Sequence, residues 1–222
     1  SRFKITAQLT FMAAFISCLI GIPLGILSAL KRNTWIDGII RVIALLGVSV
    51  PGFASATLLI LFLSLVFQYY SPVGYVGLFE NPSINMQIMI LPSIILGTSM
   101  SGSVMRMTRS SVLEILRQDF IKAIRAKGAP EKVTIFKHAL KNGLIPIITL
   151  VGMQIGSLLG GAVVTEQIFS IPGLGLMTLT AINQRDYPVI QGCVLFIAFI
   201  YVMINLLVDI LYTYVDPRIT YK

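Results

Sequence analysis

The chain has 222 residues, of which 56% are hydrophobic and only 12% are charged, and its formal net charge is +8. A soluble domain carries about twice this charged fraction, so the composition excludes an ordinary soluble protein and predicts a polytopic membrane protein. The basic residues stand at the ends of apolar stretches. Membrane orientation requires that arrangement, which argues against nucleic-acid binding.

Two apolar spans open the chain. They are expected over residues 5–30 and 41–70, and each exceeds the roughly 20 residues that cross a bilayer. Gly21 and Gly25 lie one turn apart in the first span, which favours close approach of a neighbouring helix. Pro51 removes a backbone hydrogen bond within the second span, so we expect a kink or a break there. Such a bend belongs either to a tilted helix or to the lining of a translocation path.

The next stretch contains a loop and a third span. Residues 71–85 have no lysine or arginine, which is typical of an external loop. The third span is expected over residues 87–105 and contains a run of small residues over 97–103. Serine and threonine hydroxyls can hydrogen-bond between helices. The run therefore fits either helix packing or a polar pore lining.

Residues 106–146 are the longest polar interruption of the chain and hold nine of its 17 basic residues. Two short amphipathic helices are expected inside it. Apolar side chains at three- and four-residue steps share one face of the first helix. Gly128 would end that helix, and a proline followed by an acid would start the second, which Asn142 and Gly143 would close. The apolar residues of the first helix are Leu113, Leu116, Phe120 and Ile124.

Basic loops between spans are retained in the cytoplasm, so this polar stretch is expected there. One interpretation is a loop that only orients the protein and contacts lipid headgroups. That interpretation explains the charge, but it does not explain two helices separated by a glycine. A structured loop of this kind favours docking of a soluble partner.

The fourth span is expected over residues 144–165 and carries a stripe of glycines at four-residue spacing. Such a stripe indicates tight contact between membrane helices, either within the chain or in a dimer. The stripe consists of Gly152, Gly156 and Gly160. Residues 166–188 then form a second external segment. They predict an apolar lid with a short helical piece, the carboxylate of Glu166 and a local pair of Arg185 and Asp186.

The fifth span is expected over residues 189–215, which completes an all-α membrane protein of about five transmembrane helices. Asp209 lies in the later half of this span. A carboxylate inside a span is costly and is usually paired or functional. Pairing near the helix end is the first interpretation, and a gating role is the second. With five spans, the charge bias places the first residue outside and the last residue inside.

The chain lacks the residues of an enzyme. It contains no glycine-rich phosphate loop with the pattern Gly-x4-Gly-Lys-Ser/Thr, so ATP binding in the usual way is not expected. Its one histidine, His138, has no cluster of cysteines or carboxylates beside it in the sequence to hold a metal. Cys18 and Cys193 both fall inside apolar spans and are interpreted as packing residues. We therefore expect no catalysis, cofactor or metal in this chain.

The polar stretch carries a family resemblance. Ala123, Gly128, Leu140 and Pro146 have the spacing of the cytoplasmic coupling loop in permeases of ATP-binding-cassette importers, which the sequence resembles. The residues of this stretch resemble those of the dipeptide, oligopeptide and nickel permease branch of the type I importers. Further matching stretches are residues 125–128, 138–142, 145–146, 160–166, 172–175, 185–192, 205–209 and 216–218.

The resemblance implies a permease subunit of an ATP-driven importer that depends on a binding protein. It implies a single transmembrane domain over residues 1–222, with the coupling loop over residues 106–142. Related permeases carry one further span and an external region before this point, which the resemblance implies this chain lacks. The implied ATPase-coupling residues are Ala123, Arg125, Lys127, Gly128, Ala129, Pro130, Glu131, Lys132, His138 and Leu140.

The resemblance also implies that residues 166–188 cap the outer mouth of the pathway. A bulky residue in place of Gly128 is expected to obstruct close approach at the turn between the coupling helices. Rigid spans would carry the movement of those helices to the lid. The expected outer gate and pathway residues are Pro51, Glu166, Pro172, Gly173, Gly175 and Asp186.

The implied partners are a homologous second permease, two ATPase subunits that bind ATP and Mg²⁺, and an external substrate-binding protein. The implied location is the bacterial inner membrane, with the C-terminus in the cytoplasm. Peptides are the favoured cargo, because no intramembrane histidine or cysteine–histidine set favours a metal. Nickel and glutathione remain alternatives within this branch. A self-contained channel or secondary transporter is the alternative from a different class.

Overall fold

The computed structural model describes residues 2–69, 72 and 74–215, and all regular elements within them are helices. Within these ranges, Lys132, Phe136, Lys141, Gly161 and residues 211–215 are described by their backbone alone. Four helices are long and apolar enough to cross a membrane: α1 (Arg2–Leu30), α4 (Pro82–Leu116), α7 (Leu140–Gly161) and α10 (Tyr187–Val215). A bent pair, α2 (Trp35–Ser49) and α3 (Gly52–Phe67), raises the count of spans to as many as five. The predicted all-α membrane fold is confirmed.

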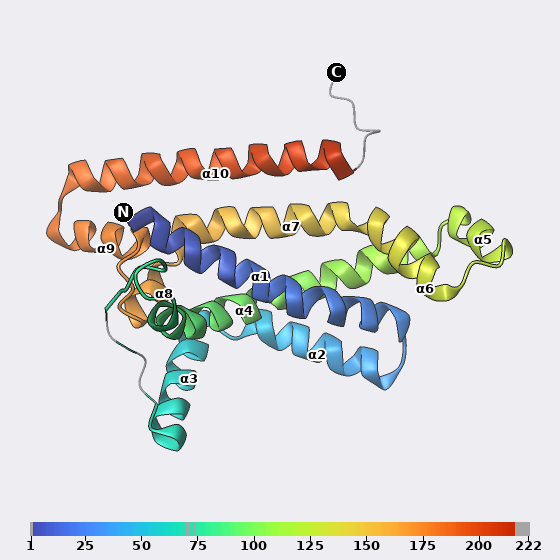
Figure 1. Cartoon of the computed structure of the whole chain (residues 1–222), viewed down its shortest axis with the longest axis horizontal. Helices are drawn as coiled ribbons and strands as arrows, with labels where there is room; N and C mark the ends of the chain where they lie inside the picture. The colour runs from blue at the N-terminus through green and yellow to red at the C-terminus, as the bar shows by residue number, and fades with distance from the viewer. Residues whose placement is uncertain (1, 70–71, 73, 216–222) are drawn as a thin grey trace.

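The long helices lie side by side, and short elements gather at the two ends of the bundle (Figure 1). At one end lie α5 (Asp119–Ala126), α6 (Glu131–Val133) and the π-helical segment η1 (Thr134–Ala139). We call this the hairpin end. At the opposite end lie the start of α1, α8 (Val163–Ile168) and α9 (Leu174–Gln184), and we call this the N-terminal end. The two ends contain the two predicted sites.

The centre of the bundle is the seam between α1 and α4, where glycines bring the backbones close together. An added Cβ on Gly21 would lie 2.8 Å from Val104 Cβ, and one on Gly25 would lie 2.6 Å from Thr108 Cβ. A Cβ on Gly102 of α4 would overlap the carbonyl oxygen of Ala44 in α2. Helices that approach this closely have no room for side-chain rearrangement between them. Helices α1, α2 and α4 therefore pack as one tight unit.

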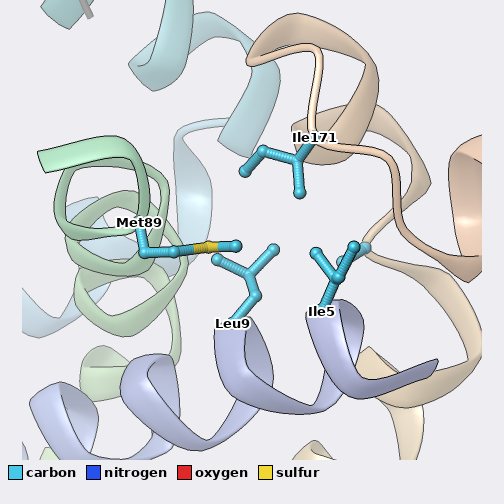
Figure 2. Close-up of a cluster of buried hydrophobic side chains, with 5 residues drawn as sticks. Ile5, Leu9, Met89 and Ile171 are labelled. Atoms are coloured by element: carbon cyan, nitrogen blue, oxygen red, sulfur yellow. The ribbon is translucent and has the colours of Figure 1, made fainter. Parts of the chain in front are cut away.

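Buried apolar clusters close both ends of that unit. At the N-terminal end, Ile5 and Leu9 of α1 point toward Met89 of α4 and toward Ile171, which lies between α8 and α9 (Figure 2). Apolar side chains removed from polar surroundings in this way hold the α8–α9 segment on the bundle. At the hairpin end a second buried cluster joins three elements, and its members are Ile26, Ala29, Val112 and Ile135.

The second predicted span breaks where Pro51 lies. Helix α2 ends at Ser49, α3 begins at Gly52, and the two helices meet at an angle of 100°. The break is therefore sharper than a tilted, kinked helix. Helix α2 also begins at Trp35, before the predicted start at Arg41. The predicted end of this span at residue 70 lies outside the described residues.

The prediction of two separate amphipathic helices in the polar stretch was wrong in detail. The third span does not end at Met105, because α4 continues to Leu116. Leu113 and Leu116 belong to α4, where they pack on the cluster at the hairpin end, whereas Phe120 and Ile124 belong to α5. The chain turns between these pairs, at Arg117. Their common period of apolar residues therefore did not correspond to one helix.

The predicted stop at Asn142 and Gly143 was also wrong, because helical structure runs from η1 directly into α7. The Asn142 side chain donates a hydrogen bond to the carbonyl of His138, 2.7 Å away within the same helical run. An added Cβ on Gly143 would lie 3.5 Å from Ser111 Cβ of α4. The glycine therefore allows a helix contact and does not end a helix. The fourth predicted span ends early, since α7 stops at Gly161 and α8 follows.

Candidate functional sites at the two ends of the bundle

The hairpin end presents a tight turn between α5 and α6. The amide of Gly128 donates to the carbonyl of Arg125 at 2.9 Å, and Gly128 has a φ of +79°. Glycine adopts this left-handed conformation without the steric cost that most other residues incur. Pro130 precedes α6 and accepts a hydrogen bond from the amide of Thr134 at 3.1 Å. The turn is therefore fixed by backbone geometry.

The physical reason for Gly128 differs from the expected one. An added Cβ on Gly128 would meet no atom within 4 Å among the described residues. The chain itself therefore offers room for a side chain, and the left-handed φ is what favours glycine there. Any obstruction by a larger residue would have to involve a partner at this exposed turn.

An ion pair closes the hairpin across the turn. The Arg125 Nη2 atom lies 2.6 Å from Glu131 Oε1, and the Arg125 Nε atom donates to Glu131 Oε2 at 3.2 Å. Both side chains are exposed. Exposed pairs contribute about 0.2–1 kcal/mol, so this pair adds little to the stability of the hairpin. A second exposed pair joins Lys122 and Asp119 within α5.

The hairpin has one anchored face and one exposed face. Ile121 of α5 is fully buried, and so are Thr134 and Ala139 of η1. Leu140 packs against the buried cluster at the hairpin end, which makes it an anchoring residue and not a presented one. His138 and Ala129 are half-buried, and the side chain of Lys132 lies outside the described part. The predicted coupling residues that are exposed are Ala123, Arg125, Lys127, Gly128, Pro130 and Glu131.

At the N-terminal end, the buried carboxyl of Glu166 organises the predicted lid. Thr6 of α1 donates its hydroxyl to Glu166 Oε1 at 2.6 Å, and the Leu176 amide of α9 donates to Oε2 at 2.8 Å. The same Thr6 oxygen accepts a hydrogen bond from the Leu174 amide at 2.8 Å. Glu166 is completely buried. One carboxyl therefore joins α8, α9 and α1.

Two predicted glycines make room for this carboxyl. An added Cβ on Gly173 would overlap the Glu166 carboxyl, and one on Gly175 would lie 3.0 Å from Glu166 Oε2. Burial raises the pKa of Glu166, and the hydrogen bonds from Thr6 and Leu176 oppose that rise. The structure thus brings Glu166, Gly173 and Gly175 together, as one site.

The other predicted lid residues lie around this site. Pro172 accepts a hydrogen bond from Arg2 Nη1 at 3.1 Å. It also lines a cavity of about 750 Å³ together with Gln8, Tyr75 and Glu80. Asp186 directly precedes α10, and its Oδ1 accepts a hydrogen bond from the Val189 amide at 3.2 Å, so its role is a helix cap.

The remaining predicted residues are placed elsewhere. Pro51 is exposed at the bend between α2 and α3. Asp209 lies at an exposed position of α10. The glycine stripe of α7 faces α10, since Cβ atoms added there would contact Val208, Tyr201 and Ile197. This stripe therefore forms a seam within the chain. Its members are Gly152, Gly156 and Gly160.

Sequence reasoning missed two buried polar groups that organise the bundle. Asp37 of α2 is fully buried and forms an ion pair with Arg109 of α4 at 2.8 Å. Asn85 of α4 is also fully buried, and its side chain donates to the carbonyl of Val76 at 2.8 Å. The one signal in the sequence for the Asp37–Arg109 pair was the acid Asp37 at the start of an apolar helix. Its partner lies 72 residues away and was counted among the basic loop residues.

Comparisons with known proteins agree with these observations. Residues 21–221 match the family described as "Binding-protein-dependent transport system inner membrane component". The dipeptide transport system permease protein DppB of Alkalihalophilus pseudofirmus is 45% identical, over 97% of this chain and 71% of the relative. The protein of the same name from Escherichia coli K12 is 40% identical, over 100% of this chain and 72% of the relative.

A solved structure supports the same fold. An inward-facing MetNI methionine ABC transporter aligns with a TM-score of 0.75, over 96% of this chain and 93% of that one. The two sequences are only 19% identical, so this likeness shows the fold alone.

Proposed function

The chain belongs to the family of binding-protein-dependent transport system inner membrane components, and on that premise we propose that it forms half of the translocation path of an ATP-driven peptide importer. The self-contained channel, considered from sequence, is set aside by this membership. The relatives named as dipeptide transport permeases support di- or oligopeptides as the cargo. Nickel and glutathione are the alternatives to be tested as substrates.

We place the hairpin end in the cytoplasm and the N-terminal end outside. The hairpin and the last turns of α4 that lead into it are rich in lysine and arginine. Positive segments of this kind are retained on the cytoplasmic side. Helix α10 then runs from the outer end to the inner end, which puts the C-terminus in the cytoplasm.

The observation that carries the proposed coupling role is the exposed α5–α6 hairpin. Its underside is anchored by Ile121, while the turn around Gly128 faces away from the chain with open space around it. An exposed and basic hairpin that is anchored on one face can insert into a groove of a partner ATPase. The basic charges would set orientation and association rate, and the exposed apolar atoms of Phe120 and Val133 would add adhesion.

The proposed mechanism is movement of rigid elements between two states. Two ATPase subunits bind ATP and Mg²⁺ and approach one another, and each carries a coupling hairpin with it. The α1–α2–α4 unit moves with the hairpin, because the glycine contacts pack these helices closely together. Residues 166–188, held on α1 through Thr6 and Glu166, move with it and change the access of peptide from the outside. The homologous second permease supplies the other half, and an external binding protein delivers the cargo.

Substitution of Gly128 tests the coupling role in the complete complex, reconstituted with both permeases, the ATPases and the binding protein. Gly128→Asn tolerates the left-handed φ, whereas Gly128→Ala does not. If the turn contacts the ATPase, Asn lowers peptide-stimulated ATP hydrolysis because its side chain enters the interface. If only the backbone matters, Asn retains activity and Ala loses it. Wild-type activity in both variants and in Gly128→Trp contradicts docking at this turn.

The cargo is tested with the same wild-type vesicles. Uptake of a labelled dipeptide, of nickel and of glutathione is compared, each in the presence and absence of ATP. ATP-dependent uptake of the dipeptide is expected. Uptake of only nickel or only glutathione would contradict the peptide assignment and leave the importer assignment in place.

A further inference from the structure

An ion pair between the fully buried Asp37 and the half-buried Arg109 joins four segments near the hairpin end. The Arg109 guanidinium donates from Nε to Asp37 Oδ1 at 2.8 Å and from Nη2 to Asp37 Oδ2 at 2.9 Å. Ser28 of α1 donates to Oδ1 at 2.6 Å, and the Asn33 amide of the α1–α2 turn donates to Oδ2 at 3.0 Å. The Asp37 side chain has no exposed surface. Both oxygens are thus fully engaged, which fixes α1, α2 and α4 relative to one another.

A pair of this kind contributes geometry more than stability. Removing the Asp37 carboxylate and most of the Arg109 side chain from solvent costs free energy that their attraction only partly offsets, so such a pair contributes little to net stability. A bidentate contact between arginine and a carboxylate nevertheless permits very few relative orientations. Arg41, one turn further along α2, lies 3.6 Å from the same carboxylate and is mostly exposed. It adds charge without the same constraint.

The pair lies between the hairpin and the bend. From Arg109, α4 continues for about 10 Å to Leu116, and the chain then enters the hairpin. From Asp37, α2 continues to Ser49 and the 100° bend at Pro51. Helix α3, beyond the bend, packs against α8, which carries Glu166. A displacement of the end of α4 therefore reaches α2 through the bidentate contact.

We infer that Asp37 and Arg109 are positioning residues that transmit movement of the coupling hairpin to the bend between α2 and α3. Without the bidentate contact, the last turns of α4, which lie beyond the close contact between Gly102 and Ala44, could move without carrying the start of α2 with them. ATP hydrolysis would then proceed without the full movement of the bend. The inference rests on the proposed function, because it assigns a route for the coupling proposed above.

The test is Arg109→Lys, which retains the positive charge but cannot make the bidentate contact. The matched control is Arg41→Gln, which removes the exposed charge beside the same carboxylate. Both variants are reconstituted with the partner subunits, and three quantities are measured: the amount of assembled complex, the rate of ATP hydrolysis and the uptake of labelled dipeptide. The deciding quantity is peptide transported per ATP hydrolysed by assembled complexes.

We expect Arg109→Lys to lower that ratio about tenfold, within the range typical of energetic coupling between sites. ATP hydrolysis should persist, and Arg41→Gln should leave the ratio within about twofold of the wild type. A purely structural role lowers the amount of complex and leaves the ratio unchanged, which would overturn the inference. An equal loss in Arg41→Gln would also overturn it, because charge alone would then explain the effect.

Should Arg109→Lys fail to assemble, Ser28→Ala decides the question. It removes one donor to the Asp37 carboxylate and leaves the ion pair in place, so the ratio should fall about threefold. An unchanged ratio in Ser28→Ala would then refute the inference. Vesicles with the wild-type complex distinguish failure of the proposed function from failure of this inference. Absence of ATP-dependent uptake of the dipeptide, nickel and glutathione alike in the wild type refutes the proposed importer function, whereas wild-type uptake with unchanged variants refutes only this inference.

Discussion

Removing the buried carboxyl of Glu166 should release the α8–α9 segment from α1. Glu166→Ala leaves the Leu176 amide and the Thr6 hydroxyl without the acceptors that lie 2.8 Å and 2.6 Å from them. A buried donor without a partner costs about 1–3 kcal/mol. We therefore expect the local opening free energy of the segment to fall by about 2 kcal/mol, because water that enters the vacated space recovers part of the loss.

The assay is hydrogen–deuterium exchange at the amides of Leu174 and Leu176 in the purified complex. A loss of about 2 kcal/mol accelerates exchange roughly 30-fold if opening is local. Glu166→Gln should be milder, at about 1 kcal/mol, because its amide can accept from Leu176 and donate to Thr6. The control is Gln167→Ala, at an exposed neighbouring position. Exchange in Glu166→Ala within twofold of the wild type would refute the assigned role of the carboxyl.

The same carboxyl, glycines of the bundle and the hairpin ion pair give three further predictions. Burial raises the pKa of Glu166 in the folded state. The stabilisation linked to this shift is therefore complete below the ordinary carboxyl pKa and is lost as the pH rises through the raised pKa. Exchange at the Leu174 amide, corrected for the intrinsic rate, should accelerate over that pH range in the wild type, and a pH dependence that persists in Glu166→Gln would contradict this. Gly25→Val should destabilise the subunit by about 1–3 kcal/mol in thermal unfolding, because its Cβ would lie 2.6 Å from Thr108 Cβ. Gly38→Val is the control, because a Cβ there meets no atom within 4 Å. Equal melting temperatures for these two variants would contradict the tight seam between α1 and α4. Arg125→Ala should change the unfolding free energy by less than about 1 kcal/mol but slow association of the ATPase in stopped-flow measurements at low salt. An unchanged association rate would show that the Arg125–Glu131 pair has no role in docking.

Hydropathy was enough to locate the spanning helices but not to find their ends. Helices α1 and α10 begin and end close to the limits of their apolar stretches, so their predicted ranges differ from the observed ones by only a few positions. Helix α4 extends through Arg106 and Arg109, which the sequence pattern assigned to a loop. The charge of Arg109 is tolerated in the helix because Asp37 binds it, and that partner is not visible from local sequence.

The predicted sites divide in the same way. The turn at Gly128 was recognisable because a glycine followed by a proline signals a turn locally, and the structure gives Gly128 a positive φ. The predicted grouping of Glu166 with Gly173 and Gly175 relied on a resemblance, and the structure supplies its physical cause in the space that the carboxyl occupies. The role of Thr6 could not be inferred, because it lies 160 residues from the carboxyl that it binds. Long-range polar contacts leave no periodic signal in a sequence.

Site-directed cross-linking tests the central claim, that the hairpin docks on a partner ATPase, most directly. Lys127→Cys places a thiol at the exposed turn, and Gln184→Cys places one at an exposed position at the other end of the bundle. Both are made with Cys18→Ala and Cys193→Ala, in the complex with its ATPase subunits. We predict a cross-link from position 127 to the ATPase and none from position 184. A cross-link from position 184, or none from position 127 in an assembled complex, would contradict the account.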